Sequence, residues 1–318
     1  MRSKQRLVFL DRWSTRKMGA SVMRVQQLSQ HMRRFHGDSY DISVVYVSRS
    51  AKNLSRTLLR LRFPGAVFLF SKYAASGWGH DDFEMVQKSA KATLIDYVDG
   101  SLDNVIFSGI DGHIASTFEG ARQIKTVLQK NGSRDDYLRG QVFTVLHNYD
   151  ARLDDFIAQR VQGSRMNMCY LGTPFETVKT KEVEQAVTFL NGSNPTEFQK
   201  SLRQVGQFNC HYGVRKDRTL TGPQVVKPFT KGATAAACDV PILVNHSTDD
   251  AAEQLGGDYP FLIKDNSSQT IAEGLQHMED SFGSGEWQRA VERMRSLHEL
   301  TSHRAVATQL HNAIQACL

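Results

Sequence analysis

The feature that most constrains this chain is the alternation of short apolar runs with longer stretches of helical spacing. In the first 148 of its 318 residues such runs occur at 6–11, 41–48, 66–71, 92–99, 104–109 and 141–148. Between them, stretches such as 20–35 repeat apolar residues every three or four positions, which is the spacing of one helix face. Strands that alternate with helices predict a parallel sheet covered by helices on both faces.

The same alternation restarts after a polar segment at 149–164, which we interpret as a linker. Strands are expected at 165–172, 240–245 and 259–263, a helix or strand at 181–192, a helix and then a strand at 198–215, and helices from 270 onward. The predicted class is therefore α/β, with two Rossmann-like domains, 1–155 and 156–318, facing a cleft. The last helix, 302–315, either crosses back to brace the first domain or packs only on the second.

Composition and charge narrow the setting and the partners. The chain is 40% hydrophobic and 23% charged, as is usual for a globular protein. No apolar run approaches the roughly 18 residues of a membrane span, and the one near the start is too short for a signal-peptide core. We therefore expect a cytoplasmic protein. Its net charge of +6 favours an anionic partner, namely nucleic acid, a phosphorylated small molecule or an anionic membrane surface.

The stretch KPFTKGATAAACDVPILVN (227–245) combines two lysines with the start of a small-sided helix. Thr230 is expected to be the N-cap and Lys231 to lie in the first turn. A lysine there is unfavourable, because the helix dipole is already positive at that end. A bound anion would make the lysine favourable there, because the backbone N–H groups, Thr230, Lys227 and Lys231 would all converge on the anion. The stretch predicts a diphosphate site; the alternative is two solvated lysines beside an ordinary helix start.

Three stretches together resemble the GT-B glycosyltransferases. Residues 227–263 resemble their C-terminal donor-binding region, MGASVMRVQQLSQHMRR (18–34) is similar to their N-terminal loop and first helix, and CYLGTPFE (169–176) to the first strand and loop of their second domain. The resemblance covers both halves in the same order. It implies a nucleotide-diphospho-sugar as co-substrate in place of a cofactor, and an acceptor on the side of the first domain. The residues expected to hold the donor are Gly19, Gly172, Thr173, Arg215, Lys227, Thr230 and Lys231.

The sequence also departs from that family. Many retaining members carry a Glu-x7-Glu pair at positions that correspond here to Val226 and Thr234, and Asp239 stands where a helix-ending glycine is usual. An inverting transferase, a divergent retaining one and a catalytically inactive binding or partner subunit all stay open. We expect a glycosyltransferase that moves a sugar to a polysaccharide or glycoconjugate acceptor.

The chemistry is expected to need no metal, because the chain contains no Asp-x-Asp pair. Cations and helix N-termini would then stabilise the leaving nucleoside diphosphate. An inverting reaction also needs a general base near the acceptor hydroxyl. Asp111 and His113 follow the predicted strand 104–109 and are our candidates; the ordinary alternative for Asp111 is a turn residue before glycine.

A basic amphipathic stretch at 48–65 raises the question of a membrane. Its cations recur at helical spacing beside an apolar stripe of Leu54, Leu58 and Leu61. Such a helix is typical of peripheral binding at an anionic membrane surface, here the inner face of the membrane, with a lipid-linked acceptor. The alternative is a solvated helix face with its leucines in the core. Nucleic acid is not expected, because no aromatic-interleaved basic motif is present.

Overall fold

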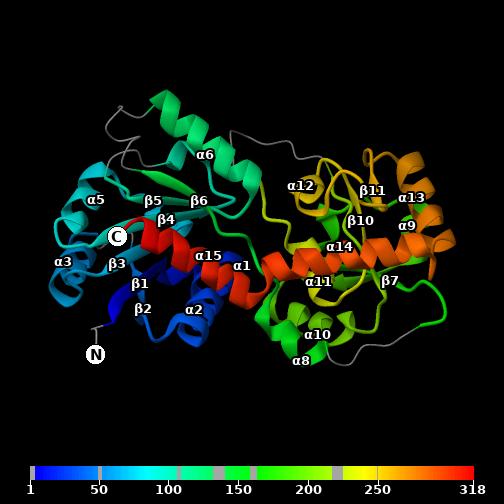
Figure 1. Cartoon of the computed structure of the whole chain (residues 1–318), viewed down its shortest axis with the longest axis horizontal. Coiled ribbons are helices and arrows are strands. Elements are labelled where there is room, and N and C mark those ends of the chain that lie inside the picture. The colour runs from blue at the N-terminus through cyan, green and yellow to red at the C-terminus, as the bar shows by residue number, and fades with distance from the viewer. Residues whose placement is uncertain are drawn as a thin grey trace. The chain divides into compact units, whose positions relative to one another are not determined.

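The computed structural model describes residues 4–48, 52–105, 109–131, 140–157, 163–216, 225–248 and 250–318. Within these, the chain forms two compact units, each an α/β arrangement (Figure 1). The first consists of Met1–His147, Leu220–Pro228 and His303–Leu318, and the second of Asn148–Thr219 and Phe229–Ser302, as far as they are described. The predicted α/β class is confirmed.

The first unit is built on a six-stranded parallel sheet in the order β2-β1-β3-β4-β5-β6. Its strands are β1 Gln5–Arg12, β2 Tyr40–Val47, β3 Val67–Ser71, β4 Ala92–Val98, β5 Gly112–Ala115 and β6 Gln141–Thr144. Along β1, Leu7 and Phe9 belong to one core cluster, whereas Val8 and Leu10 belong to another. The sheet therefore has a buried core on each face, as the two-residue period of a strand requires.

Two sets of helices cover these faces. On one lie α1 Gly19–Ser21, the π-helix η2 Val22–Gln27, α2 Leu28–His36 and α15 His303–Ala316, and on the other α3 Lys52–Arg62, α4 Lys72–Ala75, α5 His80–Gln87 and α6 Phe118–Asn131. Figure 1 shows α15 running close to α2, and the two helices pack against each other. The stripe of Val306, Leu310 and Ile314 is fully buried there. The C-terminal helix thus belongs to the first unit, as one of the two sequence-based alternatives predicted.

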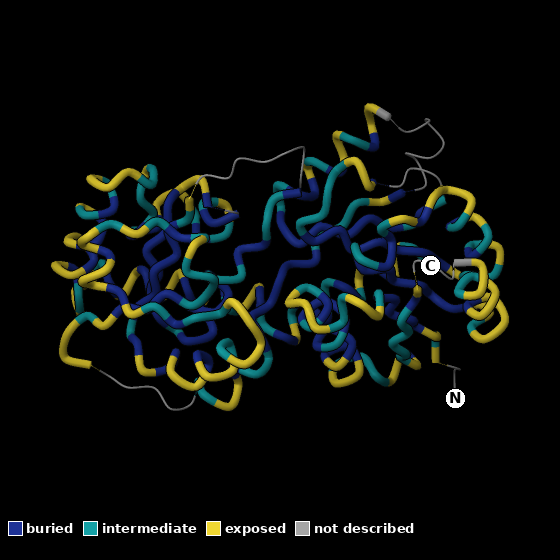
Figure 2. Tube along the Cα trace, turned by 180° about the vertical axis from the view of Figure 1, so that it is seen from behind, coloured by how far each residue is buried: buried dark blue, intermediate teal, exposed yellow. Residues whose placement is uncertain are grey.

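The second unit has a five-stranded parallel sheet in the order β11-β10-β9-β7-β8. Its strands are β7 Met168–Gly172, β8 Val187–Asn191, β9 Cys210–Tyr212, β10 Ile242–Asn245 and β11 Leu262–Ile263. Its α-helices are α8 Asp154–Ile157, α9 Lys181–Ala186, α10 Pro195–Val205, α11 Thr230–Ala237, α12 Ala251–Leu255, α13 Ser268–Asp280 and α14 Gly285–Thr301. One hydrophobic cluster unites them, and Figure 2 shows buried chain at the centre of each unit.

Two sequence-based expectations need correction. The described part of the predicted linker, 149–157 and 163–164, contains the 3-10 turn Ala151–Leu153 and α8, and Tyr149 and Leu153 are buried in the core of the second unit. Contacts therefore group 148–155 with the second unit, whereas the predicted division after residue 155 placed these residues in the first. The predicted strand 104–109 lies partly outside the described residues, and the strand that follows in the sheet begins at Gly112.

Candidate functional site

The carboxyl edge of the second unit's sheet gathers two cations around one tyrosine. In parallel sheets, the carboxyl ends of the strands are where ligands bind. Lys231, in the first turn of α11, has its Nζ 4.9 Å from the ring centroid of Tyr170 on β7. Arg215, which follows β9, acts electrostatically on the same tyrosine, as does the carboxylate of Glu176. This edge therefore holds two positive groups and one negative group around Tyr170.

A glycine lets the backbone lie close to these groups. Gly172 ends β7 at a φ of 152°, a conformation that side chains rarely adopt. A Cβ added there would lie 3.1 Å from Tyr170 Oη and 3.2 Å from Lys231 Nζ. The Tyr170 hydroxyl donates to the carbonyl oxygen of Thr173 at 2.9 Å. The absence of a side chain at Gly172 thus allows Tyr170 and Lys231 to lie close to the backbone at the end of β7.

The protonation state of Tyr170 supports this description. Burial raises the pKa of Tyr170 to about 12, and the nearby Arg215 only partly opposes this effect. At neutral pH the phenol is therefore uncharged and remains a donor to Thr173. Since the tyrosine carries no negative charge, it does not neutralise Lys231 or Arg215.

Helix α11 aims its N-terminus toward this edge, with one correction to the prediction. The helix begins at Thr230 and its N-cap position is Phe229, so Thr230 is the first helical residue and not the cap. Its first turn contains no acid. The small face is confirmed, because Ala233, Ala235 and Ala236 are buried against the core. Asp239, after the helix, adopts the left-handed conformation at φ 54° that explains the usual glycine there.

Lys227, the other predicted lysine, lies in the first unit. There it lies near Asp99, whose carboxylate binds Lys72 Nζ at 2.5 Å. Burial by itself would raise the pKa of Asp99, but Lys72 and then Lys227 outweigh burial and lower it. Within the second unit, Gly172, Thr173, Arg215 and Lys231 lie beside Tyr170, and Thr230 precedes Lys231 in the first turn of α11.

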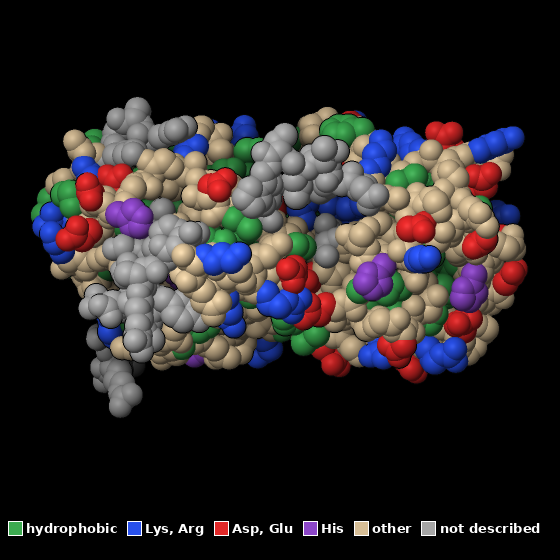
Figure 3. Space-filling view, turned by 90° about the horizontal axis from the view of Figure 1, so that it is seen from above, with side chains coloured by type: hydrophobic (Ala, Val, Ile, Leu, Met, Phe, Trp, Pro, Cys, Tyr) green, Lys and Arg blue, Asp and Glu red, His purple; other side chains and the backbone are tan. Residues whose placement is uncertain are grey.

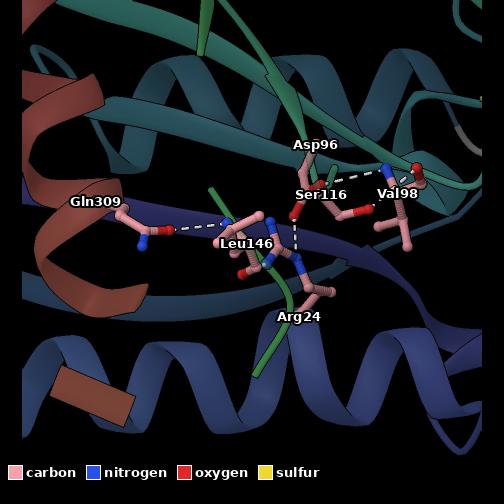
Figure 4. A network of polar contacts seen from close by, with 6 residues as sticks. All are labelled: Arg24, Asp96, Val98, Ser116, Leu146 and Gln309. Carbon is pink, nitrogen blue, oxygen red and sulfur yellow. Dashed lines mark hydrogen bonds and ion pairs between the residues drawn. The ribbon is translucent and has the colours of Figure 1, made fainter. Parts of the chain in front are cut away.

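The first unit has a polar network of its own at the carboxyl edge of its sheet (Figure 4). Arg24 Nε donates to Asp96 Oδ2 at 2.7 Å, and Arg24 Nη1 donates to the carbonyl oxygen of Leu146 at 2.8 Å. The backbone N–H of Leu146 in turn donates to Gln309 on α15 at 2.8 Å. Arg24 is 2% and Asp96 3% exposed. This buried pair joins η2 to β4, and the sequence analysis missed it; the signal was a charged residue inside each of two apolar segments.

Two further residues lie near the end of β1. Asp11 is fully buried, and its Oδ1 accepts a hydrogen bond from Ser71 Oγ at 2.7 Å, which joins the ends of β1 and β3. Gly19, a predicted donor-binding residue, begins α1, and a Cβ there would meet nothing within 4 Å. The backbone at Gly19 is therefore open on the first unit, as a ligand-facing loop requires.

The placement of the predicted catalytic pair rests on a wrong premise. Asp111 precedes β5, at the amino end of that strand, where its Oδ2 accepts the backbone N–H of Thr93 at 2.7 Å. His113 is fully buried, its Nδ1 lies 2.9 Å from Tyr97 Oη, and burial lowers its pKa to about 4. Both were expected to follow a strand, but the strand begins at Gly112. Their catalytic role stays a prediction that their placement does not support.

Two features, a metal-binding group and a membrane-spanning helix, are absent from the described residues. Among them, no group of three or more His, Cys, Asp or Glu side chains is placed to hold a metal ion. No described helix combines the length and the apolar character needed to cross a bilayer.

Comparison with known proteins shows the fold. No protein-family model matches the chain, and no curated protein matches its sequence. Solved structures do: a glycosyltransferase from Rickettsia africae (TM-score 0.67, 8% identity, 99% of both chains), sucrose-phosphate synthase from Thermosynechococcus elongatus (0.61, 11%, 98% of both), and HepE of Anabaena in complex with UDP and glucose (0.58, 11%, 98% and 99%). The chain therefore has the GT-B fold, as the sequence resemblance predicted.

Proposed function

We propose that this protein is a glycosyltransferase that binds the diphosphate of a nucleotide sugar at the carboxyl edge of the second unit's sheet. The observation that carries the proposal is the position of Lys231 and Arg215 around the neutral Tyr170, close to the backbone of Gly172. Backbone N–H groups at the start of α11 would add further donors. Such an arrangement suits an anion with several oxygens.

The same groups would serve the chemistry as well as the binding. When the bond between the sugar and the diphosphate breaks, negative charge grows on the leaving phosphate oxygen. Pre-positioned cations and N–H groups stabilise that charge more than they stabilise the ground state. Lys231 and Arg215 would take this role without a metal ion, a proposal supported by the lack of an Asp-x-Asp pair in the sequence.

The donor and acceptor classes are proposed from the neighbours. HepE was crystallised with UDP and glucose and also with UDP-glucose, and another similar structure is a lipopolysaccharide outer core galactosyltransferase. We propose a nucleotide-diphospho-sugar donor and a glycan or lipid-linked acceptor for this chain. The acceptor hydroxyl must lose its proton to a base, for which Asp111 and His113 remain only the sequence-based candidates. Peripheral contact with an anionic membrane is proposed separately, from the exposed leucines and arginines of α3.

A binding or partner subunit without activity is the alternative. The positions of the Glu-x7-Glu pair hold Val226 and Thr234, and neither side chain can ionise. Val226 instead donates its backbone N–H to Gln123, and Thr234 Oγ1 donates to the carbonyl oxygen of Thr230. This alternative predicts nucleotide binding without turnover.

The test is nucleotide binding by the wild type and by Lys231→Ala, measured by thermal shift and calorimetry with UDP, GDP, CMP, dTDP and ADP, with and without magnesium. A nucleotide at about 100 times its Kd should stabilise the wild type by roughly 2.7 kcal/mol. Lys231→Ala should weaken binding by about 10- to 100-fold, since a hydrogen bond to a charged group contributes about 1.5–3 kcal/mol. Lys200→Ala is the matched control, because this exposed lysine of the same unit pairs with Glu197.

The possible outcomes distinguish an active transferase, an inactive binding subunit and a wrongly assigned site. If no nucleotide binds the folded wild type, or if Lys231→Ala binds as tightly as Lys200→Ala, the proposed site is wrong. If a nucleotide binds, release of that nucleotide from its sugar conjugates is the next measurement. Turnover supports the transferase, and binding without any turnover supports the inactive subunit.

A further inference from the structure

Helix α3 of the first unit exposes an apolar stripe. Leu54, Leu58 and Leu61 are 59%, 52% and 77% exposed, whereas Leu59 is only 2% exposed and holds the helix on its core. The exposed leucines are spaced four and then three residues apart, so that they lie on one side of the helix. The alternative that all these leucines lie in the core is therefore wrong.

Single exposed leucines are ordinary on a protein surface, but three in one stripe are not. Contiguous exposed apolar side chains mark sites that contact another molecule or a membrane. We define the α3 surface as Leu54, Leu58 and Leu61 together with the exposed arginines of the same helix, Arg60 and Arg62.

The α3 surface is basic as well as apolar. The helix contains four cations, Lys52, Arg56, Arg60 and Arg62, and no acid. Arg56 forms an ion pair with Asp82 of α5, whereas Arg60 and Arg62 are exposed. Beyond the helix, Arg62 and Arg6 line a cavity of about 170 Å³ with Asp41. Positive groups thus outnumber negative ones along the helix and at its C-terminal end.

Residues 89–91 are hydrogen-bonded to the chain that follows α3, and they bring a further cation to that end of the helix. The backbone N–H of Gly65 donates to Ser89 at 2.7 Å, and that of Lys91 donates to Ala66 at 2.8 Å. Lys91 is exposed. Where α3 and α5 lie, Figure 3 shows hydrophobic side chains beside basic and acidic ones. Of the three acids on α5, Asp81 is exposed, Asp82 pairs with Arg56 and Glu84 lies 3.7 Å from Lys88.

We propose that the α3 surface docks on an anionic lipid bilayer, with the helix lying in the plane of the interface. The three leucines insert at the boundary of headgroups and acyl chains, and Arg60, Arg62 and Lys91 contact lipid phosphates. Three leucines bury little area, so that binding is reversible and depends on anionic lipid and low salt. The proposal does not rest on sugar transfer, since it uses none of the residues around Tyr170.

A second copy of the chain is the other candidate occupant, and charge argues against it. In a two-fold interface the same surface contacts itself, so that Arg60 and Arg62 of one copy would face those of the other. Like charges brought together in this way oppose association. An anionic bilayer offers the opposite charge to all of these cations at once.

The experiment is co-sedimentation of the full chain with vesicles of phosphatidylcholine alone and with vesicles that contain phosphatidylserine, at low and high salt. One variant carries Leu54→Ser, Leu58→Ser and Leu61→Ser, and another carries Arg60→Gln and Arg62→Gln. Matched controls in the second unit are Leu300→Ser, 45% exposed, and Arg165→Gln with Lys264→Gln, both exposed. All variants are checked for an unchanged thermal midpoint.

The wild type should bind the phosphatidylserine vesicles and release them at high salt. Each cation near an anionic leaflet contributes about 1 kcal/mol, so that the double arginine variant should bind about 30-fold more weakly. The leucine variant should lose binding, and the controls should bind like the wild type. The proposal is overturned if the wild type ignores phosphatidylserine, if either variant binds like its control, or if the leucines support only a dimer in sedimentation velocity. Nucleotide binding is measured separately, so that a failure of membrane docking can be distinguished from a failure of the proposed function.

Discussion

The two units share a parallel sheet but differ in how they treat charge at its carboxyl edge. In the first unit, opposite charges meet each other: Arg24 pairs with Asp96 and Lys72 with Asp99. In the second, Lys231 and Arg215 lie around a tyrosine that is uncharged at neutral pH. A buried ion pair holds elements of the fold in place, whereas the second edge gathers two cations and one carboxylate, that of Glu176, around a neutral ring, and this excess of positive charge favours an anion. The comparison therefore separates a structural edge from a candidate binding edge.

The largest effect is expected from removing the buried ion pair at the carboxyl edge of the first unit's sheet. Arg24→Met should lower the free energy of unfolding by about 3–5 kcal/mol, because Asp96 would remain buried without its partner. The double variant Arg24→Met, Asp96→Leu should recover most of that loss. Urea denaturation measures the change, and hydrogen exchange should show it in the first unit. A single variant within about 1 kcal/mol of the wild type would contradict the structural role of the pair.

The second prediction concerns pH and compares one buried histidine in each unit. Burial lowers the pKa of His113 and of His211 from 6.5 to about 4. The unfolded chain therefore binds more protons between pH 6.5 and 4, and the stability that each histidine contributes above pH 6.5 is lost as the pH falls through this range. The loss is about 3 kcal/mol for each histidine.

Urea denaturation at several pH values tests this dependence. His113→Asn and His211→Asn should each reduce the pH dependence in that range by about 3 kcal/mol. A free energy of unfolding that stays constant from pH 6.5 to 4 in the wild type would show that neither histidine is shielded in the way described.

The third prediction concerns Gly172, at the carboxyl edge of the second unit's sheet. Gly172→Ala should destabilise the protein by about 1–3 kcal/mol, because its φ of 152° strains an alanine and the new Cβ would crowd Tyr170 and Lys231. It should also weaken nucleotide binding. Gly257→Ala is the control, since a Cβ there meets nothing within 4 Å. Equal stability and equal nucleotide affinity in the two variants would remove Gly172 from the site.

The smallest expected effect compares two tyrosine hydroxyls. Tyr170→Phe removes the hydrogen bond to the carbonyl oxygen of Thr173, a half-buried residue, and should cost about 1 kcal/mol. Tyr97→Phe should cost somewhat more, because it takes a buried partner from His113 Nδ1. Thermal and urea denaturation compare the pair. A greater loss in Tyr170→Phe would mean that this hydroxyl has a larger structural role than its single bond indicates.

Periodicity was a good guide to the elements and a poor guide to their surroundings. It predicted most strands of the two sheets, although not β5, and the buried stripe of α15, since a regular apolar pattern records which face of an element is covered. On α3 the same kind of pattern was ambiguous, because a stripe looks alike whether the chain covers it or leaves it exposed. The predicted strand 104–109 lies partly outside the described residues, whereas β5, at Gly112–Ala115, was not predicted, as so short a strand carries little apolar pattern.

By itself, the sequence determined the GT-B resemblance, the two α/β units and most of the residues that we propose for the second unit's site. Gly172, Arg215 and Lys231 could be named because each lies next to a recognisable strand end or helix start. Only the tertiary structure decided that Lys227 belongs to the first unit, that Asp111 precedes its strand, and that Arg24 meets Asp96 across 72 positions of the chain. The physical reason is that local spacing fixes the direction of a side chain along its own element, whereas partners, burial and pKa depend on what the rest of the chain places beside it.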